Sequence, residues 1–254
     1  MIDLKGKRGL VVGIANEASI AYGCARAYRE AGAELALTYL NEKAAPYVLP
    51  LAQSLQAQWS AACDVRIAGQ LEAVFERIAH AWGRLDFLLH SIAYAPKEDL
   101  HGPLWASSGE GFAQAMDVSC HSFIRMARLA RPLMTQGGSL VAVSFHGAQQ
   151  VVPNYNMMGP VKAALEASVR TLAVELAPQR IHVHGLSTGP VATRAASGLP
   201  DFDELIAATL QRTPGGALAD IDQIGQIAAF LASPAATPMT GEITYADNGF
   251  HVTA

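Results

Sequence analysis

The sequence has little charge, few cysteines and no long apolar run. Only 16% of its 254 residues are charged, and its net charge of −4 offers no basic surface for nucleic acid. Three scattered cysteines follow no disulfide or metal-ligand spacing, so we expect reduced core residues and no metal site. No run reaches the roughly 18 apolar residues that span a membrane. No apolar run precedes Lys5–Arg8, so we also expect no signal peptide and a cytoplasmic protein.

Apolar residues are abundant, at 51%, and they occur in short runs that alternate with helical patterns. The runs that predict strands are Gly9–Ile14, Glu34–Tyr39, Ser60–Asp64, Leu85–His90, Ser139–Ser144, Ile181–Leu186 and Glu242–Ala246. The helical patterns are Ser19–Ala31, Leu71–Trp82, Phe112–Arg131 and Met157–Ala177. This alternation predicts an α/β fold: a Rossmann-like, doubly wound parallel sheet of about seven strands, flanked by helices.

We expect a single domain over residues 1–254, because no linker, repeat or low-complexity tract divides the chain. The segment at about 187–214 is rich in Gly, Pro, Thr and Ser. It predicts a substrate-binding loop with a short helix inside it.

The carboxyl end of the first strand is a candidate nucleotide site, because ligands of such sheets bind at this edge. Gly13 allows a tight turn there, and Ser19 can cap a helix whose free N–H groups could hold a pyrophosphate. The stretch lacks the G-x-G-x-x-G pattern, so an ordinary strand-to-helix turn is an equally good interpretation.

The ends of the second and third predicted strands indicate which nucleotide could bind and how. The stretch Thr38–Lys43 contains no Arg for a 2′-phosphate, and Lys43 is its only cation, which favours NADH over NADPH. Asp64 ends the third predicted strand. It could accept a hydrogen bond from an adenine amino group or, equally, cap a helix.

Tyr155 and Lys162 are the candidate chemical groups. Seven positions is two helical turns, so both side chains are expected to point into one cleft from the start of the pattern Met157–Ala177. A phenol beside an ammonium is a proton donor whose charge state can be tuned. The spacing alone is a weak signal, since chance can supply it.

Together these stretches resemble the short-chain dehydrogenase/reductase superfamily and, within it, the bacterial enoyl-acyl-carrier-protein reductases of fatty-acid synthesis. The resemblance covers essentially the whole chain. It is carried by Gly13–Ala21, His90–Pro96, Pro153–Gly159, Lys162–Glu166, Gly189–Pro190 and Arg194–Gly198. Ordinary members of the superfamily have Tyr-x3-Lys and a Ser thirteen residues before the Tyr. Here those positions are Gly159 and Ala142, which argues against a ketone as substrate and for a carbon–carbon double bond.

The resemblance implies hydride transfer from NADH to the trans-2 double bond of enoyl-acyl-carrier-protein thioesters, the last step of the elongation cycle. Tyr155 and Lys162 would be catalytic, the first at the thioester oxygen and the second at the nicotinamide ribose. The implied cofactor-binding positions are Gly13, Ser19, Ile20, Ala21, Asp64, Val65, Ser91, Ile92, Ala93, Lys162, Gly189, Val191 and Thr193. The implied substrate-binding positions are Tyr94, Leu100, Phe145, Met158, Leu199 and Phe202, for each of which core packing is the competing interpretation. Acyl carrier protein would be the partner, and the chain would form a homotetramer.

Three departures keep other functions open. Phe145 stands where the family often has a second Tyr, and Ala93 stands where it has Gly. The run Leu199–Glu204 is acidic, although the family carries basic residues there, facing the acidic helix of the carrier protein. One alternative is another short-chain reductase, acting on a ketoacyl or other conjugated substrate. A second is a nucleotide-binding paralogue without catalytic activity.

Overall fold

The computed structural model describes residues 2–191 and 202–253, which contain one seven-stranded sheet. Its order is β3-β2-β1-β4-β5-β6-β7, and all neighbouring strands run parallel. The strands are β1 (Arg8–Val12), β2 (Glu34–Tyr39), β3 (Trp59–Ala62), β4 (Phe87–His90), β5 (Gly138–Phe145), β6 (Ile181–Thr188) and β7 (Ile243–Ala246). The predicted doubly wound parallel sheet is confirmed, with strand ends displaced by at most two residues.

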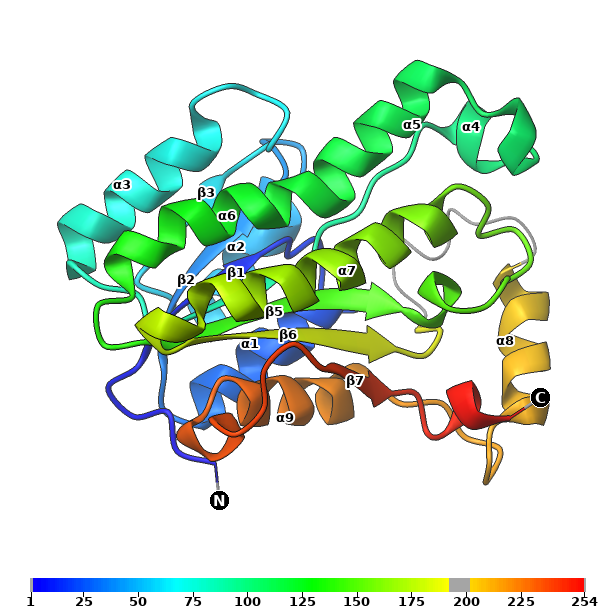
Figure 1. Cartoon of the computed structure of the whole chain (residues 1–254). Coiled ribbons are helices and arrows are strands. Elements are labelled where there is room, and N and C mark those ends of the chain that lie inside the picture. The colour runs from blue at the N-terminus through cyan, green and yellow to red at the C-terminus, as the bar shows by residue number, and fades with distance from the viewer. Residues whose placement is uncertain (1, 192–201, 254) are drawn as a thin grey trace.

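Helices cover both faces of the sheet (Figure 1). On one face, α1 (Ile20–Glu30) lies against α9 (Ile221–Leu231). On the other lie α3 (Gln70–Trp82), α6 (Ser122–Ala130) and α7 (Met158–Leu176). The remaining α-helices are α2 (Ala45–Ser54), α4 (Lys97–Leu100), α5 (Gly109–Met116) and α8 (Phe202–Arg212). No helix among the described residues is long and apolar enough to cross a membrane.

Each face of the sheet has its own apolar core. The spacing of Val161, Leu165 and Val169 puts these fully buried side chains on one stripe of α7, facing the sheet. Strand residues alternate between the two cores: Leu10 and Val12 of β1 belong to the α7 side, and Val11 belongs to the α1 side. This double burial explains why the strands read as continuous apolar runs.

The predicted helix Phe112–Arg131 is interrupted in the structure. Helix α5 ends at Met116, a π-helical turn spans Asp117–His121, and α6 follows. Within this turn the Ser119 hydroxyl donates to the Tyr94 carbonyl at 3.1 Å and accepts from the Tyr94 N–H at 2.9 Å. The buried Ser119 thus holds the segment at Tyr94 from within a π turn, a feature that often occurs at functional sites.

Helices α2 and α9 were not predicted. Pro46 and Pro50 obscure α2, although Pro46 lies in its first turn, where the missing N–H costs nothing. Helix α9 begins at a capping box in which Asp220 accepts from the Gln223 N–H at 2.8 Å and the Gln223 side chain accepts from the Asp220 N–H at 3.1 Å. Its buried residues recur at helical spacing, at Ile224, Gly225, Ala228, Ala229 and Leu231, so the signal for this helix was present in the sequence.

The strand order reverses between the neighbours β1 and β4. From β1 the chain adds β2 and β3 on one side of the sheet, and from β4 it adds β5, β6 and β7 on the other side. Crevices at such switch points hold ligands. Gly13 follows β1 and Ser91 follows β4, so their chain segments meet at this point.

Candidate active site

A cavity of about 520 Å³ opens at the carboxyl ends of the strands around the switch point. Its wall includes Gly13, Asp64, Val65, Ser91, Ile92, Ala93 and Tyr94. Gly13 has φ +108°, and a Cβ at this position would lie 2.2 Å from the Ser91 carbonyl oxygen. The turn therefore requires glycine, and the backbone stays open to a ligand at this point.

Helix α1 points its first turn at the same edge of the sheet. Ser19 occupies the N-cap position, but its hydroxyl donates to the Asn16 carbonyl at 2.6 Å and makes no cap bond, so the predicted side-chain cap is wrong. Ile20 and Ala21, the first helical residues, have N–H groups with no intrahelical acceptor. Such groups suit an anionic ligand.

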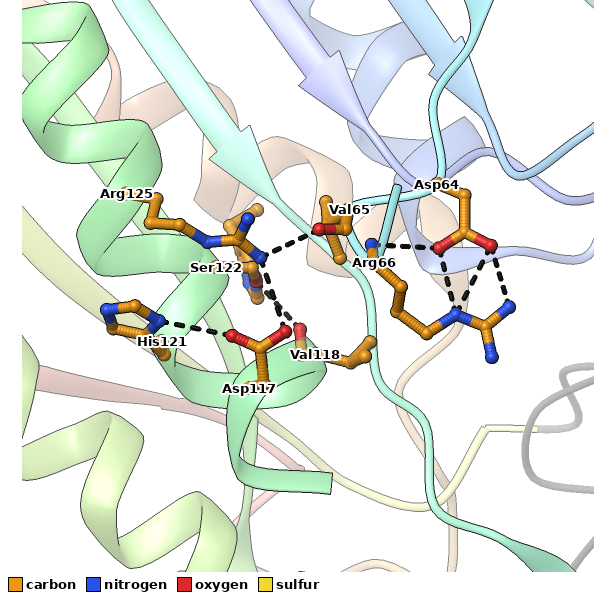
Figure 2. A network of polar contacts seen from close by, with 9 residues as sticks. Asp64, Val65, Arg66, Asp117, Val118, His121, Ser122 and Arg125 are labelled. Atoms are coloured by element: carbon orange, nitrogen blue, oxygen red, sulfur yellow. Dashed lines mark hydrogen bonds and ion pairs between the residues drawn. The ribbon is translucent and has the colours of Figure 1, made fainter. Parts of the chain in front are cut away.

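Asp64 is held by Arg66, a residue that sequence reasoning did not identify (Figure 2). The Asp64 carboxylate accepts from the Arg66 backbone N–H at 3.0 Å and from its guanidinium at 2.7, 2.9 and 3.2 Å. Helix α3 starts at Gln70, capped by Gly69, so the helix-cap interpretation of Asp64 is wrong. The Arg66 guanidinium holds the pKa of Asp64 below its ordinary value and lies 5.1 Å over the Tyr94 ring.

Val65 is fixed from the other side by Arg125 of α6 (Figure 2). The Arg125 guanidinium donates to the Val65 carbonyl at 2.9 Å and lies 3.5 Å from the Asp117 carboxylate. Asp117 also pairs with His121 at 3.1 Å. The loop after β3 is thus tied to α6 by one side chain, which sets where Val65 faces the cavity.

Tyr155 lies in a turn before α7, not on the helix, so the prediction that it stands two helical turns from Lys162 is wrong. The flanking Asn154 and Asn156 have φ +63° and +41°, a backbone region that asparagine tolerates. The Tyr155 ring meets the Phe145 ring edge-on, with centroids 4.7 Å apart. A Cβ on Gly147 would lie 2.4 Å from the Tyr155 ring, so the turn after β5 also fits closely against this phenol.

Lys162 nevertheless reaches the same strand end. Its side chain is only 5% exposed, and its Nζ donates to the Val143 carbonyl at 2.8 Å, two residues before Phe145. Burial lowers the pKa of Lys162 to about 8, and burial raises the pKa of Tyr155. Near neutral pH Tyr155 is therefore a protonated phenol and Lys162 a mostly protonated amine.

The strand β5 offers no hydroxyl at the position a ketone reductase would use. Ala142 is fully buried, between His90 of β4 and Gly185 of β6 in the sheet register. The next serine, Ser144, is buried and donates to the Glu166 carboxylate at 2.6 Å. Its hydroxyl is thus already engaged within the protein.

The other predicted site residues divide into three groups. Gly189 is buried and its N–H donates to the Ala246 carbonyl at 3.2 Å, whereas Val191 is partly buried against the α1-side core. Met158 is buried in the α7-side core and Leu100 packs against that core, and contact of either with a substrate stays a prediction. Thr193 and Leu199 lie outside the described residues, as does the side chain of Phe202, whose backbone begins α8.

The three cysteines, Cys24, Cys63 and Cys120, are free and buried, as predicted. Among residues 2–191 and 202–253 no group of three His, Cys, Asp or Glu side chains is placed to hold a metal ion.

A doubly wound sheet with a ligand cavity at its switch point, and a tyrosine and a buried lysine at the end of β5, are the features of a short-chain dehydrogenase/reductase. The enoyl-(acyl carrier protein) reductase family model matches residues 13–251, and the chain belongs to this family. It is 42% identical to enoyl-[acyl-carrier-protein] reductase [NADH] 1 of Rhizobium meliloti, over 98% of this chain and 91% of the relative. The corresponding enzyme of Aquifex aeolicus is 41% identical, over 98% and 93%.

Solved structures agree with the sequence relatives. The enoyl-(acyl-carrier-protein) reductase of Anaplasma phagocytophilum, crystallised in complex with NAD, superposes with a TM-score of 0.95 at 42% identity, covering 99% of this chain and 96% of that one. The Aquifex aeolicus NADH enzyme superposes with a TM-score of 0.96 at 41% identity, covering 99% and 98%. These values extend the likeness to the full length of the fold.

Proposed function

We propose that this protein is an NADH-dependent enoyl-acyl-carrier-protein reductase. It would reduce the trans-2 double bond of enoyl thioesters in the last step of fatty-acid elongation. The observation that carries the proposal is the partly buried Tyr155 and the buried Lys162 at the end of β5, a strand that has Ala142 in place of a serine. Family membership and relatives named as NADH enzymes support it.

The residues around the switch point fit a dinucleotide. The Cβ-free turn at Gly13 and the first-turn N–H groups of Ile20 and Ala21 suit a pyrophosphate, and the cavity beside Asp64 and Val65 has room for an adenosine. When bound, NADH supplies a hydride to the substrate. Ser91–Ala93, Gly189, Val191 and Thr193 would hold the nicotinamide half.

Tyr155 would act on the thioester oxygen, where negative charge develops as the double bond is reduced. The raised pKa of its phenol means that Tyr155 retains the proton and can donate a hydrogen bond to that oxygen, which favours the transition state over the ground state. Lys162 uses one of its three N–H donors on Val143. The other two are available for the ribose hydroxyls, and the ammonium makes the local field positive. Phe145 has no hydroxyl, so Tyr155 is the only phenol assigned to the substrate oxygen.

The acyl chain would lie against Tyr94, Leu100, Phe145, Met158, Leu199 and Phe202. Acyl carrier protein would deliver it, in the cytoplasm, to a homotetramer of this chain. Because Leu199–Glu204 is acidic, docking of an acidic carrier helix at this run would be weakened by like charge. We expect a small preference for carrier-protein over coenzyme A thioesters, checked by comparing kcat/KM for both at several salt concentrations. A strong carrier preference that disappears in Asp203→Asn/Glu204→Gln would contradict this.

The direct test is NADH oxidation with crotonyl and longer enoyl thioesters. Tyr155→Phe is expected to lower kcat by about 10²-fold or more, because one donor to a developing oxyanion is lost, while NADH affinity changes little. Lys162→Ala should weaken NADH binding as well as turnover. Oxidation with a 3-ketoacyl thioester in preference to the enoyl thioester would favour the other short-chain reductase. Absence of both activities in protein that binds NADH would favour the inactive paralogue.

A further inference from the structure

A buried carboxylate lies one turn beyond Lys162 on α7. Glu166 is 2% exposed, and its two oxygens accept from the Ser144 hydroxyl at 2.6 Å and the Gln149 side-chain amide at 3.1 Å. Acceptance at both oxygens is the pattern of an ionised carboxyl group. A buried charge is costly unless something compensates it.

Four ionisable side chains that interact with Lys162 or Glu166 have pKa values shifted so that they are neutral at pH 7. Burial lowers the pKa of His90 to about 3 and raises the pKa of the Cys120 thiol, and it also raises the pKa of the Tyr155 and Tyr245 phenols. His146, in the turn after β5, makes no side-chain hydrogen bond within the described residues.

Lys162 lies one helical turn before Glu166 on α7 and both side chains are buried, so its ammonium is placed to balance the carboxylate. The two form no direct ion pair in the described part of the chain, but Glu166 raises the pKa of Lys162 against the larger opposing effect of burial. Cys120 would act in the same direction only as a thiolate, and its raised pKa keeps it a thiol. The lasting negative field at Lys162 comes from Glu166.

The same carboxylate also fixes the turn that contacts the catalytic phenol. Ser144 and Gln149 lie on either side of Phe145–Gly147, the segment that fits against the Tyr155 ring. One buried group on α7 thus holds both ends of this turn.

We propose that Glu166 is a positioning residue of the reaction, which keeps Lys162 an ammonium and fastens the turn Phe145–Gly147 to α7. This rests on the proposed function only in so far as Lys162 binds the cofactor. The charge balance itself is a property of the protein alone. In the pH range where Lys162 would otherwise lose its proton, Glu166 preserves the donor that holds the ribose.

The first test titrates Lys162 directly, by NMR of its ¹⁵N-labelled side chain in protein without cofactor. Glu166→Gln retains the shape but removes the charge, and we expect the midpoint of Lys162 to fall by about one pH unit. Glu166→Asp retains the charge and should restore most of this loss. Ser144→Ala removes one hydrogen bond to Glu166 but leaves the charge of Glu166 in place. It should therefore lower thermal stability and leave the titration midpoint of Lys162 unchanged.

NADH affinity across pH provides the second readout. In Glu166→Gln, binding should be about tenfold weaker than in the wild type at pH 8.5 and less than threefold weaker at pH 6.5. An unmoved Lys162 midpoint, or a loss of affinity that is equal at every pH, would overturn the charge-balancing role. Normal titration without any turnover would instead count against the proposed reaction alone.

A double variant keeps the proposal testable if Glu166→Gln is poorly stable. Lys162→Met/Glu166→Gln removes both buried charges, so it should be more stable than the sum of the single losses predicts in equilibrium unfolding. Strictly additive losses would mean that the two groups do not interact, and the proposal would fail.

Discussion

The nucleotide end and the chemical end of this site handle charge in opposite ways. At the nucleotide end, Asp64 is paired directly with Arg66, whose side chain is 37% exposed, so water and salt screen the pair. At the chemical end, Lys162 and Glu166 are 5% and 2% exposed and make no direct pair. The first arrangement tolerates change, because little free energy depends on it. The arrangement of Lys162 and Glu166 is sensitive to change, because each buried charge depends on the other, one helical turn away, for its balance.

The largest expected effect lies at the chemical end, in the packing around Tyr155. Gly147→Ala would place a Cβ 2.4 Å from the Tyr155 ring, so the phenol must move. We expect kcat/KM to fall by about 10²-fold, because small displacements of a catalytic group are costly, while NADH affinity stays within about twofold. Steady-state kinetics and NADH titration check this. Gly109→Ala is the control, since nothing lies within 4 Å of its Cβ and it should have wild-type activity.

At the nucleotide end the most damaging change is Gly13→Ala. It combines φ +108° with a Cβ 2.2 Å from the Ser91 carbonyl, so β1 and β4 must separate at the switch point. We expect NADH affinity to fall by about tenfold or more, measured by fluorescence titration, together with a lower melting temperature. Gly6→Ala is the control, because Gly6 also has a positive φ, +74°, but nothing lies within 4 Å of its Cβ. It introduces the same kind of backbone strain without a steric clash. Equal destabilisation in both variants would show that the contact with Ser91 is unimportant.

Arg66→Ala should have the smallest effect. The ion pair is partly exposed, so we expect at most about 1 kcal/mol of unfolding free energy and less than fivefold in NADH affinity. Because the pKa of Asp64 is lowered in the folded state, its stabilising contribution is present above its ordinary value of 3.8 and is lost as pH falls through the lowered pKa. The difference between wild type and variant in urea unfolding should be constant from pH 5 to 8. A tenfold loss of NADH affinity in Arg66→Ala would contradict the comparison, because it would make the nucleotide end as sensitive to change as the chemical end.

The parts of the fold that follow local periodicity could be predicted from sequence. Strand β2 was predicted residue for residue at Glu34–Tyr39, because the apolar run is bounded by Gly32 and by polar residues. The break in Phe112–Arg131 could not be predicted, since the π turn depends on Ser119 meeting Tyr94, a contact between distant segments.

The same distinction applies to the site. Tyr155, Lys162 and Ala142 stand in a linear motif and were identified as candidates from spacing and resemblance. Arg66 was missed because its role depends on a loop that folds back on Asp64, and the importance of Glu166 depends on a strand residue, Ser144, that no helical pattern reveals. A charged residue on the buried stripe of α7 was the available signal, since apolar residues occupy the neighbouring buried positions.

The adjacency of β1 and β4 also has a consequence for how the protein folds. The segments β2, α2, β3 and α3 lie between these two strands in the sequence. Gly13 and Ser91 therefore meet only after these segments have folded on the β2 side of β1. Parallel strands that are far apart in the sequence pair slowly, because the entropy cost of closing the loop arises before the stabilising contacts form. The capacity to bind dinucleotide should therefore appear late in refolding, after most helical signal has returned.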